Sequence, residues 1–149
     1  MDKKNNIVIL MADDEEDDQL MARDAYETNR LHNVLYFVKD GLELMDYLRR
    51  QGNFSDPSTS PRPGLILLDL NMPLMDGREA LKEIKSDPEL RSIPVVVLTT
   101  SSAEEDIIKT YEYGVNSFIT KPVTFQGLVE VIKQTGIYWF EIVELPDKT

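Results

Sequence analysis

The sequence predicts an open α/β sheet with helices on both faces, and two observations support this prediction. First, short apolar runs alternate with longer amphipathic stretches along the chain; the runs span residues 7–11, 34–38, 65–68, 95–98 and 117–120. Second, three of these runs consist almost wholly of Val, Ile and Leu, which is typical of parallel strands buried on both faces. Parallel neighbours need right-handed helical crossovers, so helices are expected on both sides of the sheet.

Each amphipathic stretch gathers apolar side chains on one helical face. The sets are Leu20, Met21 and Ala25; Leu44, Met45 and Leu48; Ala80, Leu81 and Ile84; and Leu128, Val129 and Ile132. A further helix is predicted over residues 103–113, with Ser102 and Glu105 as a capping box at its start. Asp76 and Glu79 make a similar start for the helix before it.

The length of 149 residues allows one domain with a substantial core. We expect a core over about residues 7–135 and an aromatic C-terminal extension over about 136–149. The Ser- and Pro-rich stretch 52–64 is expected to be a surface insertion, because neither side of it could fold alone.

Composition excludes several classes of partner. There are 16 basic and 27 acidic residues, a net charge of −11, which argues against nucleic-acid or anionic-membrane binding. The chain has no cysteine, so a reducing compartment is expected. No apolar run is long enough for a signal-peptide core or a membrane span. The sequence therefore predicts a soluble, cytoplasmic protein.

Polar side chains stand where four of the predicted strands end. Asp13 and Asp14 follow the first strand, Asp69 the third, Thr99 closes the fourth and Lys121 follows the fifth. Because ligands of open α/β sheets bind outside the carboxyl ends of the strands, we expect three acids, a hydroxyl and an amine to converge there.

This group of side chains predicts phosphoryl chemistry with a metal. Three close carboxylates repel one another unless a cation sits among them, and Mg²⁺ prefers such hard oxygen ligands. Asp69 could then act as a nucleophile toward a phosphoryl group, forming an acyl phosphate. Lys121 would add positive charge, and Thr99 could donate a hydrogen bond to the arriving group.

Four motifs together resemble the bacterial receiver family of response regulators. They are Asp13-Asp14, residues 67–77 (LLDLNMPLMDG), Val97-Leu98-Thr99 and Thr120-Lys121-Pro122, in the order and spacing of that family. Within the family, the chain is similar to the small stand-alone regulators that partner cyanobacterial phytochromes. That narrower resemblance rests on residues 76–79, residues 93–101, the Pro-containing insertion and the aromatic tail ending in Leu145-Pro146.

The family resemblance implies a flavodoxin-like, doubly wound (βα)5 fold with a five-stranded parallel sheet in the order 2-1-3-4-5. It also implies the following residue roles. Asp69 is the phosphoacceptor. Asp14 and Asp69 give carboxylate ligands to Mg²⁺, Asn71 gives its backbone carbonyl, and Asp13 binds the ion through water. Thr99 and Phe118 are the switch pair, Lys121 binds phosphate, and the Lys121–Pro122 peptide is cis. One departure is the further acids Glu15, Glu16, Asp17 and Asp18, which fit the helix macrodipole but leave open which acids set metal affinity.

The resemblance implies a phosphorylation-activated switch that receives its phosphoryl group from a sensor histidine kinase, a phytochrome among the candidates. We expect it to signal to an unknown downstream protein by altered docking, with no DNA-binding output domain, and to catalyse only its own phosphorylation and dephosphorylation. One rival is a Mg²⁺-dependent phosphatase of the haloacid dehalogenase type. Such enzymes typically carry an acid two residues after the nucleophile, where this chain has Asn71. Another rival is a docking module that never turns over phosphate; the intact set of Asp69, Thr99 and Lys121 argues against it.

The aromatic residues near the C-terminus suggest assembly. Tyr138, Trp139 and Phe140 follow the last helix, where little of the sheet remains to cover them. Large aromatics left at a surface tend to mark interfaces. We therefore predict a two-fold homodimer with Tyr113, Trp139 and Phe140 at or near the contact, and the sequence leaves open whether the dimer depends on phosphorylation.

Overall fold

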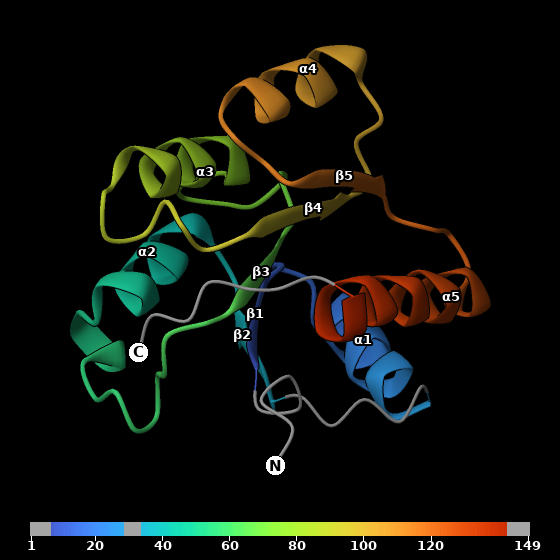
Figure 1. The fold of residues 1–149 in the computed structure, drawn as a ribbon, viewed down its shortest axis with the longest axis horizontal. Helices are drawn as coiled ribbons and strands as arrows, with labels where there is room; N and C mark the ends of the chain where they lie inside the picture. Colours follow the sequence, from blue (N-terminus) through green and yellow to red (C-terminus); the bar gives the residue numbers. More distant parts are fainter. Residues whose placement is uncertain (1–6, 29–33, 143–149) are drawn as a thin grey trace.

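The computed structural model describes residues 7–28 and 34–142, and this part of the chain alternates strands and helices (Figure 1). The elements are β1 (Val8–Ala12), α1 (Glu16–Thr28), β2 (Val34–Val38), α2 (Gly41–Arg49), β3 (Leu65–Leu68), α3 (Gly77–Ser86), β4 (Val95–Thr99), α4 (Glu104–Glu112), β5 (Ser117–Thr120) and α5 (Phe125–Gly136). A short 3₁₀ turn, η2 (Gly52–Phe54), follows α2, and a π-helical segment, η3 (Ile137–Ile142), continues from α5.

The strands form one parallel sheet in the order β2-β1-β3-β4-β5, which confirms the predicted flavodoxin-like fold. Helices α2, α3 and α4 lie on one side of the sheet, and α1 and α5 lie together on the other (Figure 1). None of the described helices is long and apolar enough to cross a membrane.

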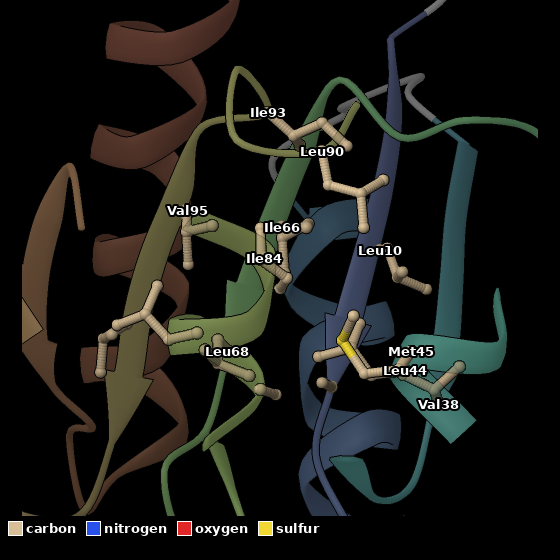
Figure 2. Packing of buried hydrophobic residues seen from close by; sticks show 14 of the residues in the cluster. Leu10, Val38, Leu44, Met45, Ile66, Leu68, Ile84, Leu90, Ile93 and Val95 are labelled. Atoms are coloured by element: carbon tan, nitrogen blue, oxygen red, sulfur yellow. The ribbon is translucent and has the colours of Figure 1, made fainter. Parts of the chain in front are cut away.

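The uninterrupted apolar runs are explained by burial on both faces of the sheet. In β3, Ile66 and Leu68 join the cluster under α2 and α3, whereas Leu65 and Leu67 join the cluster under α1 and α5. Successive side chains of a strand point to opposite faces of the sheet. Because helices cover both faces, all four residues are buried. The first of these clusters is drawn in Figure 2, where side chains of the inner strands meet those of α2 and α3.

The start of α4 differs from the sequence prediction. The helix begins at Glu104, and its N-cap is Ala103, whose side chain makes no capping hydrogen bond. Ser102 is exposed and stands one residue too early to be the N-cap, so the predicted capping box with Glu105 is wrong. The hydroxyl of the neighbouring Ser101 accepts from the Ala103 N–H at 3.4 Å. The start of α3 agrees with the prediction, since Asp76 caps it by accepting from two backbone N–H groups.

The C-terminal aromatic segment is also placed differently from the prediction. Trp139 is only 7% exposed and belongs to the same buried cluster as Ala22 and Ala25 of α1 and Leu128 of α5. The expectation that Trp139 is left uncovered is therefore wrong, because η3 carries it back over the α1–α5 face. Tyr138 is half exposed and packs edge-on against Trp139, with ring centroids 5.4 Å apart. The side chain of Phe140 lies outside the described residues.

Candidate active site

The sheet register brings the predicted site residues to one edge. Ala12 pairs with Leu68 in the β1–β3 ladder, so Asp13 and Asp69, the next residues along the chain, emerge side by side. The ladders also continue one step past the strands: the Asp69 N–H donates to the Ala12 carbonyl at 3.0 Å, and the Lys121 N–H to the Thr99 carbonyl at 2.6 Å. The predicted convergence at the carboxyl ends of the strands is observed.

Asp69 is buried, and both of its carboxylate oxygens accept hydrogen bonds. Oδ1 accepts from the Thr99 hydroxyl at 2.7 Å and from the Asn71 N–H at 3.1 Å. Oδ2 accepts from Lys121 Nζ at 3.2 Å. A buried carboxylate with three donors is compensated for its loss of water and is held in one orientation.

The start of α3 fixes the backbone that carries Asp69. The Gly77 N–H donates to the Leu70 carbonyl at 2.9 Å, and a Cβ at position 77 would lie 2.2 Å from the Asp69 carbonyl oxygen. Only glycine allows this approach, since no other residue lacks a Cβ. The close packing at Gly77 therefore places the start of α3 directly against the backbone of Asp69.

Lys121 is the cation at the centre of the site. Its side chain is 8% exposed, and Nζ donates to Asp13 Oδ2 at 2.6 Å, Asp18 Oδ2 at 2.7 Å and Asp69 Oδ2 at 3.2 Å. Burial by itself would lower the pKa of Lys121, but hydrogen bonds to Asp13 and Asp18 outweigh it and raise the pKa above its usual value. The ammonium therefore stays charged and uses all three of its protons on carboxylates.

Asp18 is the site residue that sequence reasoning missed. It was interpreted as one of several first-turn acids on the helix dipole, but its carboxylate contacts Lys121. No local pattern distinguishes Asp18 from the other acids in the first turn of α1, because its role depends on where Lys121 arrives after β5. The neighbouring Glu16 and Asp17 are exposed, as expected for solvated first-turn acids.

Asp13 is the most deeply buried acid of the site. Its Oδ1 accepts from the Glu15 N–H at 3.0 Å, while Oδ2 accepts from Lys121. Burial raises the pKa of Asp13 to about 6, although the bonds from Lys121 and Glu15 pull it down. We attribute the net rise to burial, which disfavours the charged form more than one ammonium shared by three acids can offset.

The acids at this edge fit a divalent cation. One carboxylate oxygen from each of Asp13, Asp14 and Asp69 lies within 4.8 Å of the others, and Asp14 is exposed to solvent. A hard cation that uses a few carboxylates and retains water, as Mg²⁺ does, matches this donor set. Asn71, predicted to contribute its carbonyl, belongs to the same turn through its N–H bond to Asp69; its part as a ligand stays a prediction.

The predicted switch residues lie on adjacent strands. Thr99 is fully buried at the end of β4 with its hydroxyl on Asp69. Phe118 of β5 is partly buried and packs against the cluster under α2 and α3. The Lys121–Pro122 peptide is trans, so the cis form implied by the family resemblance is wrong for this structure. Trans is the form that a proline peptide prefers by about 0.5–1 kcal/mol, and the chain reaches α5 with this peptide in the trans form.

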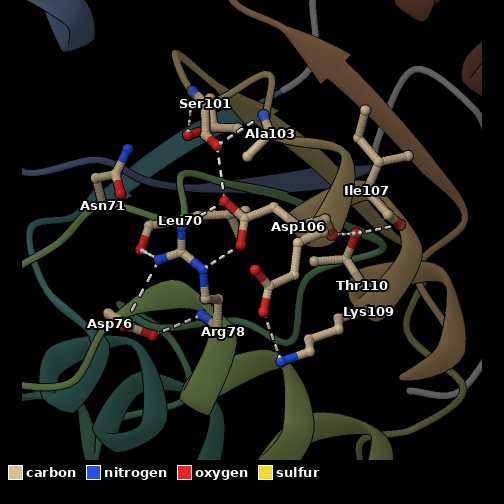
Figure 3. A network of polar contacts seen from close by, with 12 residues as sticks. Leu70, Asn71, Asp76, Arg78, Ser101, Ala103, Asp106, Ile107, Lys109 and Thr110 are labelled. Atoms are coloured by element: carbon tan, nitrogen blue, oxygen red, sulfur yellow. Dashed lines mark hydrogen bonds and ion pairs between the residues drawn. The ribbon is translucent and has the colours of Figure 1, made fainter.

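A second polar network joins the start of α3 to α4 (Figure 3). Arg78 donates to both carboxylate oxygens of Asp106, at 2.7 Å each, and the Ser101 hydroxyl donates to Asp106 Oδ2 at 2.7 Å. The hydrogen bonds from Arg78 are the main reason that the pKa of Asp106 falls to about 2. No role was predicted for Arg78 or Asp106, because the pairing depends on how α3 and α4 meet in space.

Fold and site together define a receiver domain. A buried aspartate after β3, an acidic pair after β1, a hydroxyl at the end of β4 and a lysine after β5 meet in a (βα)5 sheet. The chain belongs to the response regulator receiver family, whose domain model matches residues 9–133.

The relatives include regulators named for phytochromes. Response regulator Rcp1 of Synechocystis sp. is 43% identical over 129 residues, which cover 87% of this chain and 86% of Rcp1. The crystal structure of the phosphorylated cyanobacterial phytochrome response regulator RcpA is similar, with a TM-score of 0.89 and 40% identity over 95% of this chain and 99% of RcpA. The Mn²⁺-bound form of Rcp1 gives a TM-score of 0.86 and 42% identity over 95% of this chain and 99% of that one.

Proposed function

We propose that this chain is a phosphorylation-activated switch in which Asp69 accepts a phosphoryl group from a sensor histidine kinase. The observation that supports this most directly is the arrangement around Asp69. Its two oxygens are held by Thr99, Asn71 and Lys121, and Asp13 and Asp14 stand beside it. One Asp69 oxygen attacks phosphorus, the P–N bond to the kinase histidine breaks, and the imidazole recovers a proton.

The chain's own residues supply most of what this step needs. Lys121 places positive charge beside the transferred oxygens, and the Thr99 hydroxyl and Asn71 N–H orient the carboxylate. Asp13, Asp14 and Asp69, with the Asn71 carbonyl, would hold Mg²⁺, which when bound supplies charge that offsets the negative phosphoryl group. The Mn²⁺-bound form of Rcp1 supports divalent-metal binding by this kind of site.

A phytochrome is the kinase partner we favour, since the chain is similar to Rcp1 and to RcpA, a cyanobacterial phytochrome response regulator. Phosphorylation would draw the Thr99 hydroxyl toward the new group and let Phe118 move, changing the surface of α4 and β5. A modification shifts such an equilibrium only by its different affinity for the two states. The signal would pass to a downstream protein by docking.

The alternatives have weaker support. A phosphatase of the haloacid dehalogenase type needs an acid–base group two residues after the nucleophile, and Asn71 cannot transfer a proton there. A docking module with no phosphate chemistry would not need Lys121 and Thr99 bonded to Asp69.

We also propose a homodimer through the face of α4 and β5, where Ile108 and Tyr111 are about half exposed and Tyr113 lies at the end of α4. Trp139 no longer supports this contact, because it is buried within one copy. Sedimentation of wild type and Tyr113→Ala over a concentration range, with and without acetyl phosphate, tests it. A wild-type monomer at high micromolar concentration under both conditions contradicts the dimer.

Acetyl phosphate with Mg²⁺, read by intact mass, tests the phosphorylation. Wild type should gain about 80 Da, one phosphoryl group, while Asp69→Asn and wild type with EDTA should gain none. Asp17→Asn is the matched control, because it removes one exposed acid near the site without touching Asp69. Equal incorporation in Asp69→Asn would overturn the assignment, and incorporation undiminished by EDTA would overturn the metal requirement.

A further inference from the structure

The contacts of Lys121 are unequal, and the shortest of them are not with the proposed phosphoacceptor. Nζ lies 2.6 Å from Asp13 Oδ2 and 2.7 Å from Asp18 Oδ2, but 3.2 Å from Asp69 Oδ2. Charge-assisted N–H···O bonds are usually about 2.7–2.9 Å, so the bond to Asp69 is a long one. The ammonium is therefore held toward β1 and α1 rather than toward β3.

Asp18 is the member of this trio that has no other part in the site. Asp13 and Asp69 belong to the group of acids that could share a metal ion, and within the described residues Asp18 does not. Its side chain is 26% exposed, so it keeps contact with water while Lys121 is almost covered. Its position in the first turn of α1 also lets the helix dipole stabilise its charge.

We propose that Asp18 is a positioning residue that holds the Lys121 ammonium away from Asp69 and so weakens the interaction of Lys121 with a phosphoryl group on Asp69. Lys121 has three protons and three carboxylate partners. A phosphoryl group on Asp69 adds oxygens that also need Lys121, and Lys121 reaches them only by giving up part of its bond to Asp18. This inference rests on the proposed function, since it concerns the strength of that same site.

Fluoroberyllate, a phosphoryl analogue, tests the proposal at saturating Mg²⁺, with the bound species measured by ¹⁹F NMR. Asp18→Asn keeps the side-chain shape but removes the charge that draws Lys121 aside. Its affinity for fluoroberyllate should exceed that of Asp17→Asn at least about twofold, the low end of coupling between contacting residues. Asp17→Asn has the same net charge and helix turn, and Asp17 is exposed, so it controls for long-range repulsion.

Two further results decide whether the effect passes through Lys121. In a Lys121→Met background, adding Asp18→Asn should leave fluoroberyllate affinity unchanged, because the competing ammonium is gone. Equal affinities for Asp18→Asn and Asp17→Asn, or a gain that persists without Lys121, would overturn the proposal while leaving phosphorylation of Asp69 intact.

The ¹³Cε and ¹⁵Nζ NMR shifts of Lys121 test the contact without any phosphoryl chemistry. They should move in unphosphorylated Asp18→Asn and stay at their wild-type values in Asp17→Asn. If wild type binds no fluoroberyllate, the proposed function fails. The Lys121 shifts still test the contact between Asp18 and Lys121 in that case. Unchanged shifts in Asp18→Asn would refute the positioning role.

Discussion

The hydroxyl of Thr99 donates to Asp69 Oδ1 at 2.7 Å, so the end of β4 is attached directly to the proposed phosphoacceptor. Thr99 is fully buried, and the bond lies within the protein rather than in water. The β4–α4 loop begins at the next residue. This hydrogen bond is therefore a direct contact between Asp69 and the residue that precedes the loop.

Replacing Thr99 should separate phosphorylation from response. Thr99→Ala should still gain a phosphoryl group on Asp69, but the NMR shift changes over α4 should be reduced, because the hydroxyl that follows the phosphoryl group is missing. Thr99→Ser retains the hydroxyl and should respond like wild type. A full response in Thr99→Ala would show that the coupling runs elsewhere.

Metal affinity should depend on Asp14 more than on the acids that follow it. Asp14→Asn should weaken Mg²⁺ binding about tenfold or more, because losing a ligand should cost at least as much as losing a group that only orients one. Glu16→Gln and Asp17→Asn should act only through screened charge. Calorimetric titration of Mg²⁺ measures this. Similar losses in all three variants would favour a diffuse acidic patch.

The Arg78–Asp106 pair gives a pH-dependent contribution to stability. The hydrogen bond from Arg78 is the largest of the effects that together lower the pKa of Asp106 from 3.8 to about 2, so the folded state favours the charged carboxylate. The contribution is thus fully present above pH about 4 and disappears as the pH falls through about 2. Asp106→Asn should cost about 1 kcal/mol at neutral pH, the upper end for a partly exposed ion pair.

Urea unfolding of wild type and Asp106→Asn at pH 7 and near pH 2 measures this contribution. The difference between the two proteins should shrink at the lower pH. Glu105→Gln is a suitable control, since Glu105 is exposed and pairs only with exposed Lys109 in the described structure. A difference that is the same at both pH values would mean that Asp106 acts through packing, not charge.

Gly77→Ala should destabilise the protein even though alanine is the better helix former by about 1 kcal/mol. A Cβ at this position lies 2.2 Å from the Asp69 carbonyl oxygen, and overpacking of this kind costs about 1–3 kcal/mol. Lys82→Ala on the exposed side of α3 should change the free energy of unfolding little. Chemical denaturation of both variants compares them, and a stabilised Gly77→Ala would contradict the close packing.

Trp139→Ala should lower the free energy of unfolding by about 3–5 kcal/mol, the usual cost of emptying a buried aromatic site. Tyr138→Ala, one residue earlier, should cost much less because Tyr138 is half exposed. Denaturant titration followed by circular dichroism compares the two. Equal small losses would mean that the tail packs only weakly on α1.

The parts of the structure that could be predicted are those set by pattern and chain order. Strand positions, the both-sided burial of β3 and the meeting of Asp13, Asp69, Thr99 and Lys121 all follow from periodicity and from the geometry of parallel sheets. The Asp76 cap also followed, since it depends on neighbours within one turn.

The parts that could not be predicted depend on tertiary contacts. Asp18 and its exposed neighbour Asp17 are the same residue type in the same turn, and only the approach of β5 distinguishes them. The Arg78–Asp106 pair joins residues 28 apart through the docking of α4. The sequence predicts Trp139 at the surface because nothing in the helical pattern indicates η3. In the structure this segment places Trp139 back over α1.

The burial of Trp139 makes the protein's single tryptophan an optical probe of one particular event. It lies in the cluster beneath α1 and α5, on the opposite side of the sheet from α4. Its emission should therefore report whether the C-terminal segment is docked, and stay nearly constant during metal binding or phosphorylation. A fluorescence change on activation would then be a signal that the rearrangement extends across the sheet to the opposite layer of helices.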